Sequence, residues 1–213
     1  MKKLTRKKVI LLAIILSIAF ASGTARGGSW SAALYGGYFM PTGGWTEHRY
    51  APGVNQFGGG MNVGLDFEYQ LGPKWSLAAV VQYAGLSTSD WENYVKDSGE
   101  YLDAQARLFN LALAVRPYIV STRANKIKLE FGLGIAFLTG EESYQGLTYG
   151  YDFMVNGSFS LVAGVEHNWL FNEKGALVFR AGLLYAADGI SYADGESLSP
   201  LGFPLSLGVR YWF

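Results

Sequence analysis

Strict alternation between apolar residues and other residues is the pattern that most constrains this chain. In residues 199–213, every odd position from Leu201 to Phe213 is apolar, whereas the even positions hold Gly, Pro, Ser, Arg and Trp. The same alternation recurs in MNVGLDFEYQL (61–71), KIKLEFGLGIAF (126–137) and YDFMVNGSFSLVAGVEHNW (151–169). A period of two over such lengths predicts β-strands with one apolar face.

Four further segments are weaker strand candidates: WSAALYGGYFM (30–40), WSLAAVVQYAGL (75–86), YLDAQARLFNLALAVRPYIV (101–120) and ALVFRAGLLYA (176–186). In the first two, we expect glycine and alanine on the inner side. The segment 101–120 changes phase near residues 108–110, which we interpret as a β-bulge. The total is eight predicted strands.

The links between these strands alternate in length. Short links occur at 71–74, 122–125 and 172–175, and long polar links at about 43–57, 87–100, 140–150 and 187–199. Short periplasmic turns and long external loops are typical of membrane barrels, in which closure leaves no backbone edge unpaired in lipid. The prediction is an all-β fold, a transmembrane eight-stranded antiparallel up-and-down β-barrel, with side chains filling its bore.

The N-terminal segment has the layout of a secretory signal peptide. A basic head is followed by an apolar run from Val9 to Ala21, too short to span a bilayer, and cleavage is expected after Ala21, with Ala25 as a second site. We expect residues 22–213 to form one membrane β-barrel domain. Five of the 17 basic residues leave with residues 1–21 and all 17 acidic residues stay, giving a net charge of −5.

Charge and cysteine content exclude several classes of function. A negative net charge argues against nucleic acid as a partner, because phosphate binding needs clustered lysine and arginine. The chain has no cysteine, which excludes a disulfide scaffold and a thiolate metal site. We predict no cofactor and no metal.

The C-terminal strand carries a more specific signal. The residues from Ser206 to Phe213 resemble the insertion signal of outer-membrane barrels, with a glycine, an aromatic residue and a terminal phenylalanine at Gly208, Tyr211 and Phe213. The whole of residues 22–213 resembles the OmpA-, OmpX- and OmpW-like small barrels and surface antigens. This resemblance implies the outer membrane of a Gram-negative-type bacterium, contact with outer-membrane lipid and lipopolysaccharide, a monomer, and insertion by the barrel-assembly machinery.

The alternation also predicts which charged residues face the bore. They lie near the short links or the C-terminus and should cluster in the periplasmic half; they are Asp66, Glu68, Arg116, Lys128, Glu130, Glu166, Arg180 and Arg210. Counting from the 172–175 turn pairs Glu166 with Arg180 across a hairpin. One interpretation is a structural salt-bridge network that plugs the bore; the other is a gate whose pairs swap to open a narrow ion path.

Aromatic residues at both strand ends fit interfacial girdles. Those beside the short links are Trp30, Tyr69, Trp75, Trp169, Phe171, Tyr211 and Phe213, and those toward the long links are Tyr38, Tyr83, Tyr101, Tyr151 and Tyr185. The long links hold an acidic excess, which we interpret either as a solvated outer surface or as a surface that binds divalent cations or attaches to a cationic surface. DWENYVKDSGE lacks the ligand spacing of a calcium-binding EF-hand loop.

Several functions remain open at this stage. The leading hypothesis is a non-enzymatic barrel without a wide pore, with a structural or surface role. The alternative is a narrow channel for ions or small apolar solutes. A lipid A-modifying enzyme would have to use His48 with Ser87, Ser89 or Asp90, around which no catalytic motif occurs. A soluble lipocalin-like barrel is disfavoured because it would need its apolar side chains inside.

Overall fold

The computed structural model describes residues 29–42, 47–48, 51–55, 58–86, 102–144, 147–151, 157–187, 190–191 and 197–213. Eight long strands dominate: β1 (Trp30–Thr42), β4 (Gly60–Gln70), β5 (Trp75–Leu86), β6 (Leu102–Ser121), β7 (Asn125–Tyr144), β9 (Ser158–Leu170), β10 (Gly175–Ala186) and β13 (Leu201–Trp212). Five short strands lie between them: β2 (Glu47–His48), β3 (Ala51–Asn55), β8 (Leu147–Tyr151), β11 (Ile190–Ser191) and β12 (Ser197–Leu198).

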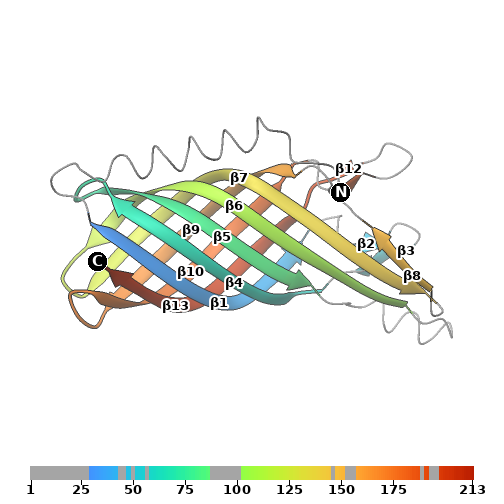
Figure 1. Ribbon diagram of the computed structural model, residues 1–213, viewed down its shortest axis with the longest axis horizontal. Helices are drawn as coiled ribbons and strands as arrows, with labels where there is room; N and C mark the ends of the chain where they lie inside the picture. Colours follow the sequence, from blue (N-terminus) through green and yellow to red (C-terminus); the bar gives the residue numbers. More distant parts are fainter. Residues whose placement is uncertain are drawn as a thin grey trace.

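The eight long strands close into a barrel. Each pairs antiparallel with its neighbour, β1 pairs with both β4 and β13, and the β6–β7 pairing closes the ring. Figure 1 shows the strands wrapped at a steep tilt around one axis. The predicted eight-stranded antiparallel barrel is therefore confirmed. In the described ranges, no helix has the length and apolarity needed to cross a membrane.

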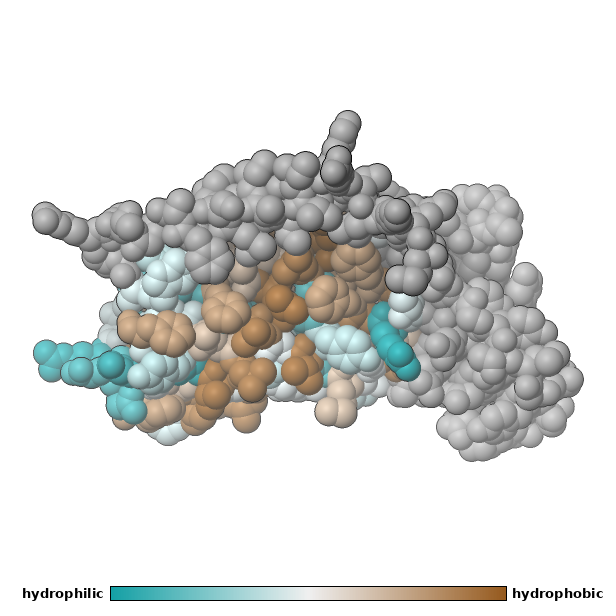
Figure 2. All heavy atoms as spheres, in the orientation of Figure 1, coloured by the Kyte–Doolittle hydropathy of each residue, from teal (hydrophilic) through white to brown (hydrophobic). Residues whose placement is uncertain are grey.

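Side chains alternate between the outer surface and the bore along every long strand. On β7, Phe131 and Leu133 are more than half exposed, whereas Lys128 and Glu130 on the other face are buried. Figure 2 shows apolar residues across the middle of the barrel wall and hydrophilic residues at the end of the short turns. The predicted apolar exterior holds for these strands, and the predicted charged interior holds at their short-turn end.

The short turns lie at the same end of the barrel as the start of β1 and the end of β13. The turns at 71–74, 122–124 and 171–174 join consecutive strands, as predicted. The Phe213 N–H donates to the Trp30 carbonyl at 2.9 Å, and the Trp212 N–H donates to the Lys174 carbonyl at 2.8 Å. The C-terminus therefore lies at the short-turn end, visible in Figure 1.

The β-bulge predicted near residues 108–110 is wrong. The β5–β6 register is continuous there, with Ala84 opposite Leu108 and Gln82 opposite Asn110. The register shift in β6 occurs instead between Tyr118 and Val120. The change of phase has another cause: Leu108 is an apolar residue on the inward face, buried at 2% exposure, so the apolar pattern changes there while the strand pairing does not.

Two further expectations need correction. The link at 140–150 is largely strand, because β7 continues to Tyr144 and pairs with β8. The inner side of β1 carries not only Ala33 and Gly37 but also the buried aromatic rings of Tyr35 and Phe39. Residues 1–28, which include the predicted signal peptide, lie outside the described residues.

Candidate functional site

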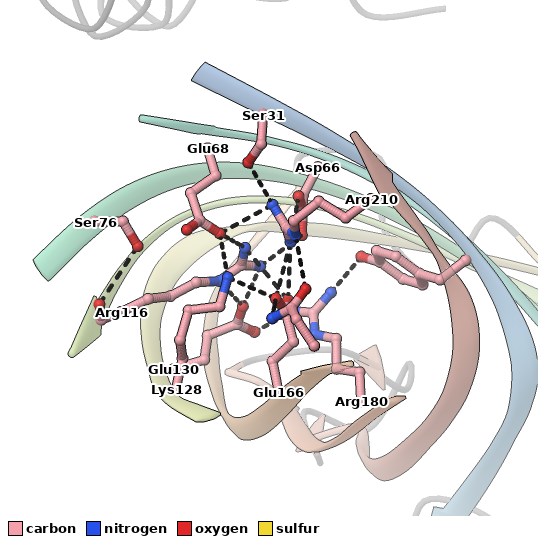
Figure 3. A network of polar contacts seen from close by, with 12 residues as sticks. Ser31, Asp66, Glu68, Ser76, Arg116, Lys128, Glu130, Glu166, Arg180 and Arg210 are labelled. Atoms are coloured by element: carbon pink, nitrogen blue, oxygen red, sulfur yellow. Dashed lines mark hydrogen bonds and ion pairs between the residues drawn. The ribbon is translucent and has the colours of Figure 1, made fainter. Parts of the chain in front are cut away.

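The candidate site is a cluster of charged side chains inside the bore. Four carboxylates and four cations are almost fully buried, at 0–7% exposure, and they come from β4, β6, β7, β9, β10 and β13. They are Asp66, Glu68, Glu130, Glu166, Arg116, Lys128, Arg180 and Arg210, the set that alternation placed in the bore. Figure 3 shows these side chains converging from opposite walls. With four charges of each sign, the cluster is formally neutral.

Arg116 of β6 is the most connected residue of the cluster. Its guanidinium lies 2.8 Å from Asp66 and 2.8 Å from Glu68, both on β4. It also donates through Nε to Glu130 at 2.7 Å and lies 3.5 Å from Glu166. One cation therefore contacts all four carboxylates and joins β6 to strands that are not its neighbours.

Arg210 of β13 holds the other side of the cluster. Its guanidinium lies 3.0 Å from Asp66, 3.0 Å from Glu68 and 3.0 Å from Glu166. It also donates to Ser31 Oγ at 2.9 Å. Because the last strand is tied to β1, β4 and β9 through a single side chain, Arg210 fixes the closing strand against the rest of the barrel.

The two remaining cations complete the pairing. Lys128 Nζ lies 2.6 Å from Glu68 and 2.6 Å from Glu166. Arg180 pairs with Glu130 and donates to the Tyr35 hydroxyl. Glu166 and Arg180 are register partners in the β9–β10 hairpin, as predicted, but the predicted ion pair between them is replaced by the Arg180–Glu130 pair.

Sequence reasoning missed the neutral residues that complete this network. Tyr118 donates its hydroxyl to Glu68 at 2.9 Å, and Asn168 donates to Glu166 at 2.7 Å. Tyr35 faces inward because glycines flank it in the register, Gly64 on β4 and Gly208 on β13. A Cβ at Gly64 would lie 2.0 Å from the Tyr35 ring, so this pair of glycines was the available signal.

A layer of uncharged polar side chains lies farther along the strands toward the long loops. Gln82 donates to Asn62 at 2.9 Å, and Asn62 donates to Ser206 at 2.8 Å. On the other wall, Ser160 donates to Asn110 at 2.6 Å. The Asn110 Nδ2 group is buried without a hydrogen-bond partner.

The loop end of the bore is apolar. Its large inward side chains are at most 4% exposed; they are Phe39, Leu86, Leu108, Leu138 and Leu184. Leu108 and Leu138 are direct register partners, and the Phe39 ring occupies the space beside Gly202. The bore therefore passes from a charged layer through a polar layer to an apolar one.

The charged side chains of the cluster are paired with one another. Every carboxylate in it is within ion-pair distance of a cation, and no group of His, Cys, Asp or Glu suited to a metal ion occurs among the described residues. His167 faces outward, with Nε2 2.9 Å from Asn125 Oδ1 and its ring stacked on Phe179. The side chains of His48, Ser87, Ser89 and Asp90 lie outside the described part, as do those of the acidic loop residues.

The chain resembles known membrane proteins in structure although not in sequence. No protein-family model matches it, and no curated protein matches it. A major outer membrane protein from Thermus thermophilus superposes with a TM-score of 0.54 at 12% identity, covering 88% of this chain and 100% of that one. The fold is that of a small outer-membrane β-barrel. Neisserial surface protein A has a similar structure, with a TM-score of 0.53 at 13% identity over 88% of this chain and 100% of that one.

In this small outer-membrane barrel fold, the three residues of the predicted C-terminal insertion signal occupy different environments. Tyr211 and Phe213 point outward, 50% and 70% exposed, with ring centroids 5.6 Å apart. Gly208 lies against β1, where an added Cβ would be 2.2 Å from the Leu34 carbonyl oxygen. Gly208 thus has a packing role within the barrel, while the two aromatic side chains are exposed at its short-turn end.

Proposed function

We propose that this protein is an integral outer-membrane barrel with a closed bore, serving a structural or surface role. The single observation that carries the proposal is the pairing of an apolar exterior with a neutral, fully ion-paired interior. Apolar side chains on all eight strands are exposed, at 37–74%, while eight charged residues are buried behind them. Exposed apolar area on this scale is stable in lipid and unstable in water.

The layers of the bore support a closed state. Separating a buried ion pair leaves uncompensated charges, which costs about 3–5 kcal/mol when one partner is removed. Each of the eight charges has such a partner, and the loop end adds Phe39, Leu108 and Leu138 as an apolar barrier. An ion crossing this bore would have to displace both layers.

Single-channel recording in planar bilayers tests this proposal. We expect the purified, refolded protein to insert and to show no conductance steps. The matched variant replaces the apolar barrier by Leu108→Ser together with Leu138→Ser, which leaves the charge cluster intact. Steady conductance by the unmodified protein would reject the closed bore.

A narrow conducting path is the second candidate, favoured by the polar layer of Asn62, Gln82 and Asn110 beyond the charge cluster. In this alternative the Arg180–Glu130 pair opens as a gate. Arg180→Gln would then raise conductance, whereas in the closed-bore proposal it lowers stability without producing current.

Export and assembly follow from the sequence expectations. We propose cleavage after Ala21, contact with outer-membrane lipid and lipopolysaccharide, and recognition of Gly208, Tyr211 and Phe213 by the barrel-assembly machinery. N-terminal sequencing of the membrane-extracted protein tests the first. Deletion of Phe213, compared with Phe203→Ala on the same strand, tests the last, with slower assembly expected for the deletion alone.

We also propose that the protein is not an enzyme. The supporting point is that the charged groups buried in the described barrel are all engaged with one another. Mass spectrometry of lipid A from cells with the protein and with its His48→Ala variant tests this, and identical lipid A is expected. A lipid A modification that depends on His48 would establish the enzymatic alternative.

A further inference from the structure

A groove of about 800 Å³ lies on the outer face of the barrel at the short-turn end. It runs between β1, β13 and the turn that joins β9 to β10. Its apolar walls include Leu34, Leu65, Val209 and Tyr211, and its rim holds Glu173 and Lys174. The proposed function does not use this groove.

The groove follows from the side chains on either side of Tyr211. In the register, Tyr211 lies between Ala32 of β1 and Gly175 of β10, which both lack bulk. The Phe171 ring leans over Gly175, where an added Cβ would be 2.5 Å away from it. The groove is therefore lined by the small residues Ala32 and Gly175, with Tyr211 between them in the register and the Phe171 ring beside Gly175.

The groove extends from the apolar outer wall of the barrel to its exposed turn, as a site at a membrane interface would. Leu34 and Val209 are exposed at 57% and 52%, so the floor belongs to the apolar exterior. The rim belongs to the exposed turn 171–174, in which the Lys174 backbone N–H donates to Asn172 Oδ1 at 2.8 Å. An apolar slot with one acid and one base at its polar end matches an acyl chain joined to a headgroup that carries both charges.

We propose that this groove binds one phospholipid whose headgroup carries a phosphate and a primary ammonium. The phosphate pairs with Lys174, the ammonium donates to Glu173, and one acyl chain lies against Leu34 and Val209. A singly anionic headgroup would pair with Lys174 but place negative charge beside Glu173. A quaternary ammonium has no N–H to donate to Glu173. This inference rests on the proposed membrane location.

The test measures which lipid stays on the protein. The full exported chain is reconstituted into vesicles with equal parts of phosphatidylethanolamine, phosphatidylglycerol and phosphatidylcholine of identical acyl chains, and native mass spectrometry then counts the retained lipids. We expect one retained phosphatidylethanolamine. Lys174→Gln should lower its retained fraction about threefold to fivefold, the scale of an exposed charge pair. Glu173→Gln should shift the preference toward phosphatidylglycerol.

A groove-filling variant separates the acyl-chain contact from the headgroup contact. Ala32→Phe should abolish retention of all three lipids, because the added ring occupies the slot beside Tyr211. Matched controls are Lys74→Gln in the turn between β4 and β5, and Leu133→Phe on the outer face of β7. Both should retain phosphatidylethanolamine as the unmodified protein does.

The outcomes distinguish this inference from the proposed function. Flotation of the same vesicles first reports whether the protein is membrane-integrated. If it floats but retains the three lipids equally, or if Ala32→Phe retains lipid normally, the site is rejected and the membrane location stands. If the chain stays in the aqueous fraction, both are rejected.

Discussion

Glu166 and Arg180 face each other in the β9–β10 register, yet the Arg180 guanidinium reaches across to Glu130 of β7. The Glu166 carboxylate is already bound by Lys128 at 2.6 Å and by Arg210 at 3.0 Å. Inside a narrow barrel, side chains from several walls compete for one partner. Ion pairing in this bore is therefore set by the whole layer rather than by one hairpin.

A double-mutant cycle should reproduce this choice of partner. We expect a coupling energy of about 2 kcal/mol between Glu130→Gln and Arg180→Gln, because the two groups are in direct buried contact. The coupling between Glu166→Gln and Arg180→Gln should be smaller by about 1 kcal/mol. Both cycles are measured by urea unfolding in lipid vesicles. Equal couplings, or a larger one for Glu166, would contradict the observed pairing.

Arg116 should be the cation whose loss destabilises the barrel most. Arg116→Met removes one cation contact from each of the four carboxylates and leaves one buried negative charge uncompensated, so we expect a loss of about 3–5 kcal/mol in unfolding free energy. Arg123→Met, in the exposed turn that follows the same strand, is the control and should change stability by less than about 0.5 kcal/mol. The two variants are compared by the same unfolding assay. If the Arg116→Met and Arg123→Met proteins were equally stable, the ion pairs of Arg116 would contribute nothing to the stability of the barrel.

Gly208 should tolerate no side chain. An added Cβ would lie 2.2 Å from the Leu34 carbonyl oxygen and 2.6 Å from the Tyr35 Cβ, so β1 and β13 would have to separate. We expect Gly208→Ala to cost about 1–3 kcal/mol through overpacking. Gly72→Ala is the control, because no atom lies within 4 Å of its added Cβ. If Gly208→Ala is as stable as the unmodified protein, Gly208 has no packing role, and its only proposed role is in the assembly signal.

A charged residue introduced on the outer wall should lower the unfolding free energy more, the deeper it lies in the bilayer. Leu133 is 58% exposed in the barrel part of β7, and Leu133→Lys should cost about 2–4 kcal/mol in a bilayer. Met61 is 74% exposed near the loop end of β4, and Met61→Lys should cost only about 0–1 kcal/mol. Unfolding from vesicles measures both. Equal small costs would indicate that the outer wall faces water.

Alternation was sufficient to predict the two faces of most strands. On β7 and β13 it placed Phe131, Leu133 and Leu207 outside and Lys128 and Arg210 inside, because one face of each strand is uniformly apolar. It failed on β6, where Leu108 is apolar and also faces inward. An apolar layer inside the bore removes the contrast on which the pattern depends.

The partners within the bore were beyond sequence reasoning. Register relates only adjacent strands, and the contacts of Arg116 with Asp66 and Glu68 cross over β5. Such contacts depend on strand tilt and on side-chain length. The inward position of Tyr35 was missed because it depends on the space left by Gly64 and Gly208 on other strands.

Spin-label accessibility along β7 tests the central claim most directly. The chain has no cysteine, so single cysteines can be introduced one at a time at positions 127–137 in the vesicle-bound protein. We expect labels at odd positions to collide strongly with dissolved oxygen and weakly with a water-soluble nickel chelate, as lipid-facing groups do. Labels at even positions should be shielded from both reagents. High accessibility of the odd positions to the nickel chelate would contradict a lipid-facing outer wall and with it the membrane barrel.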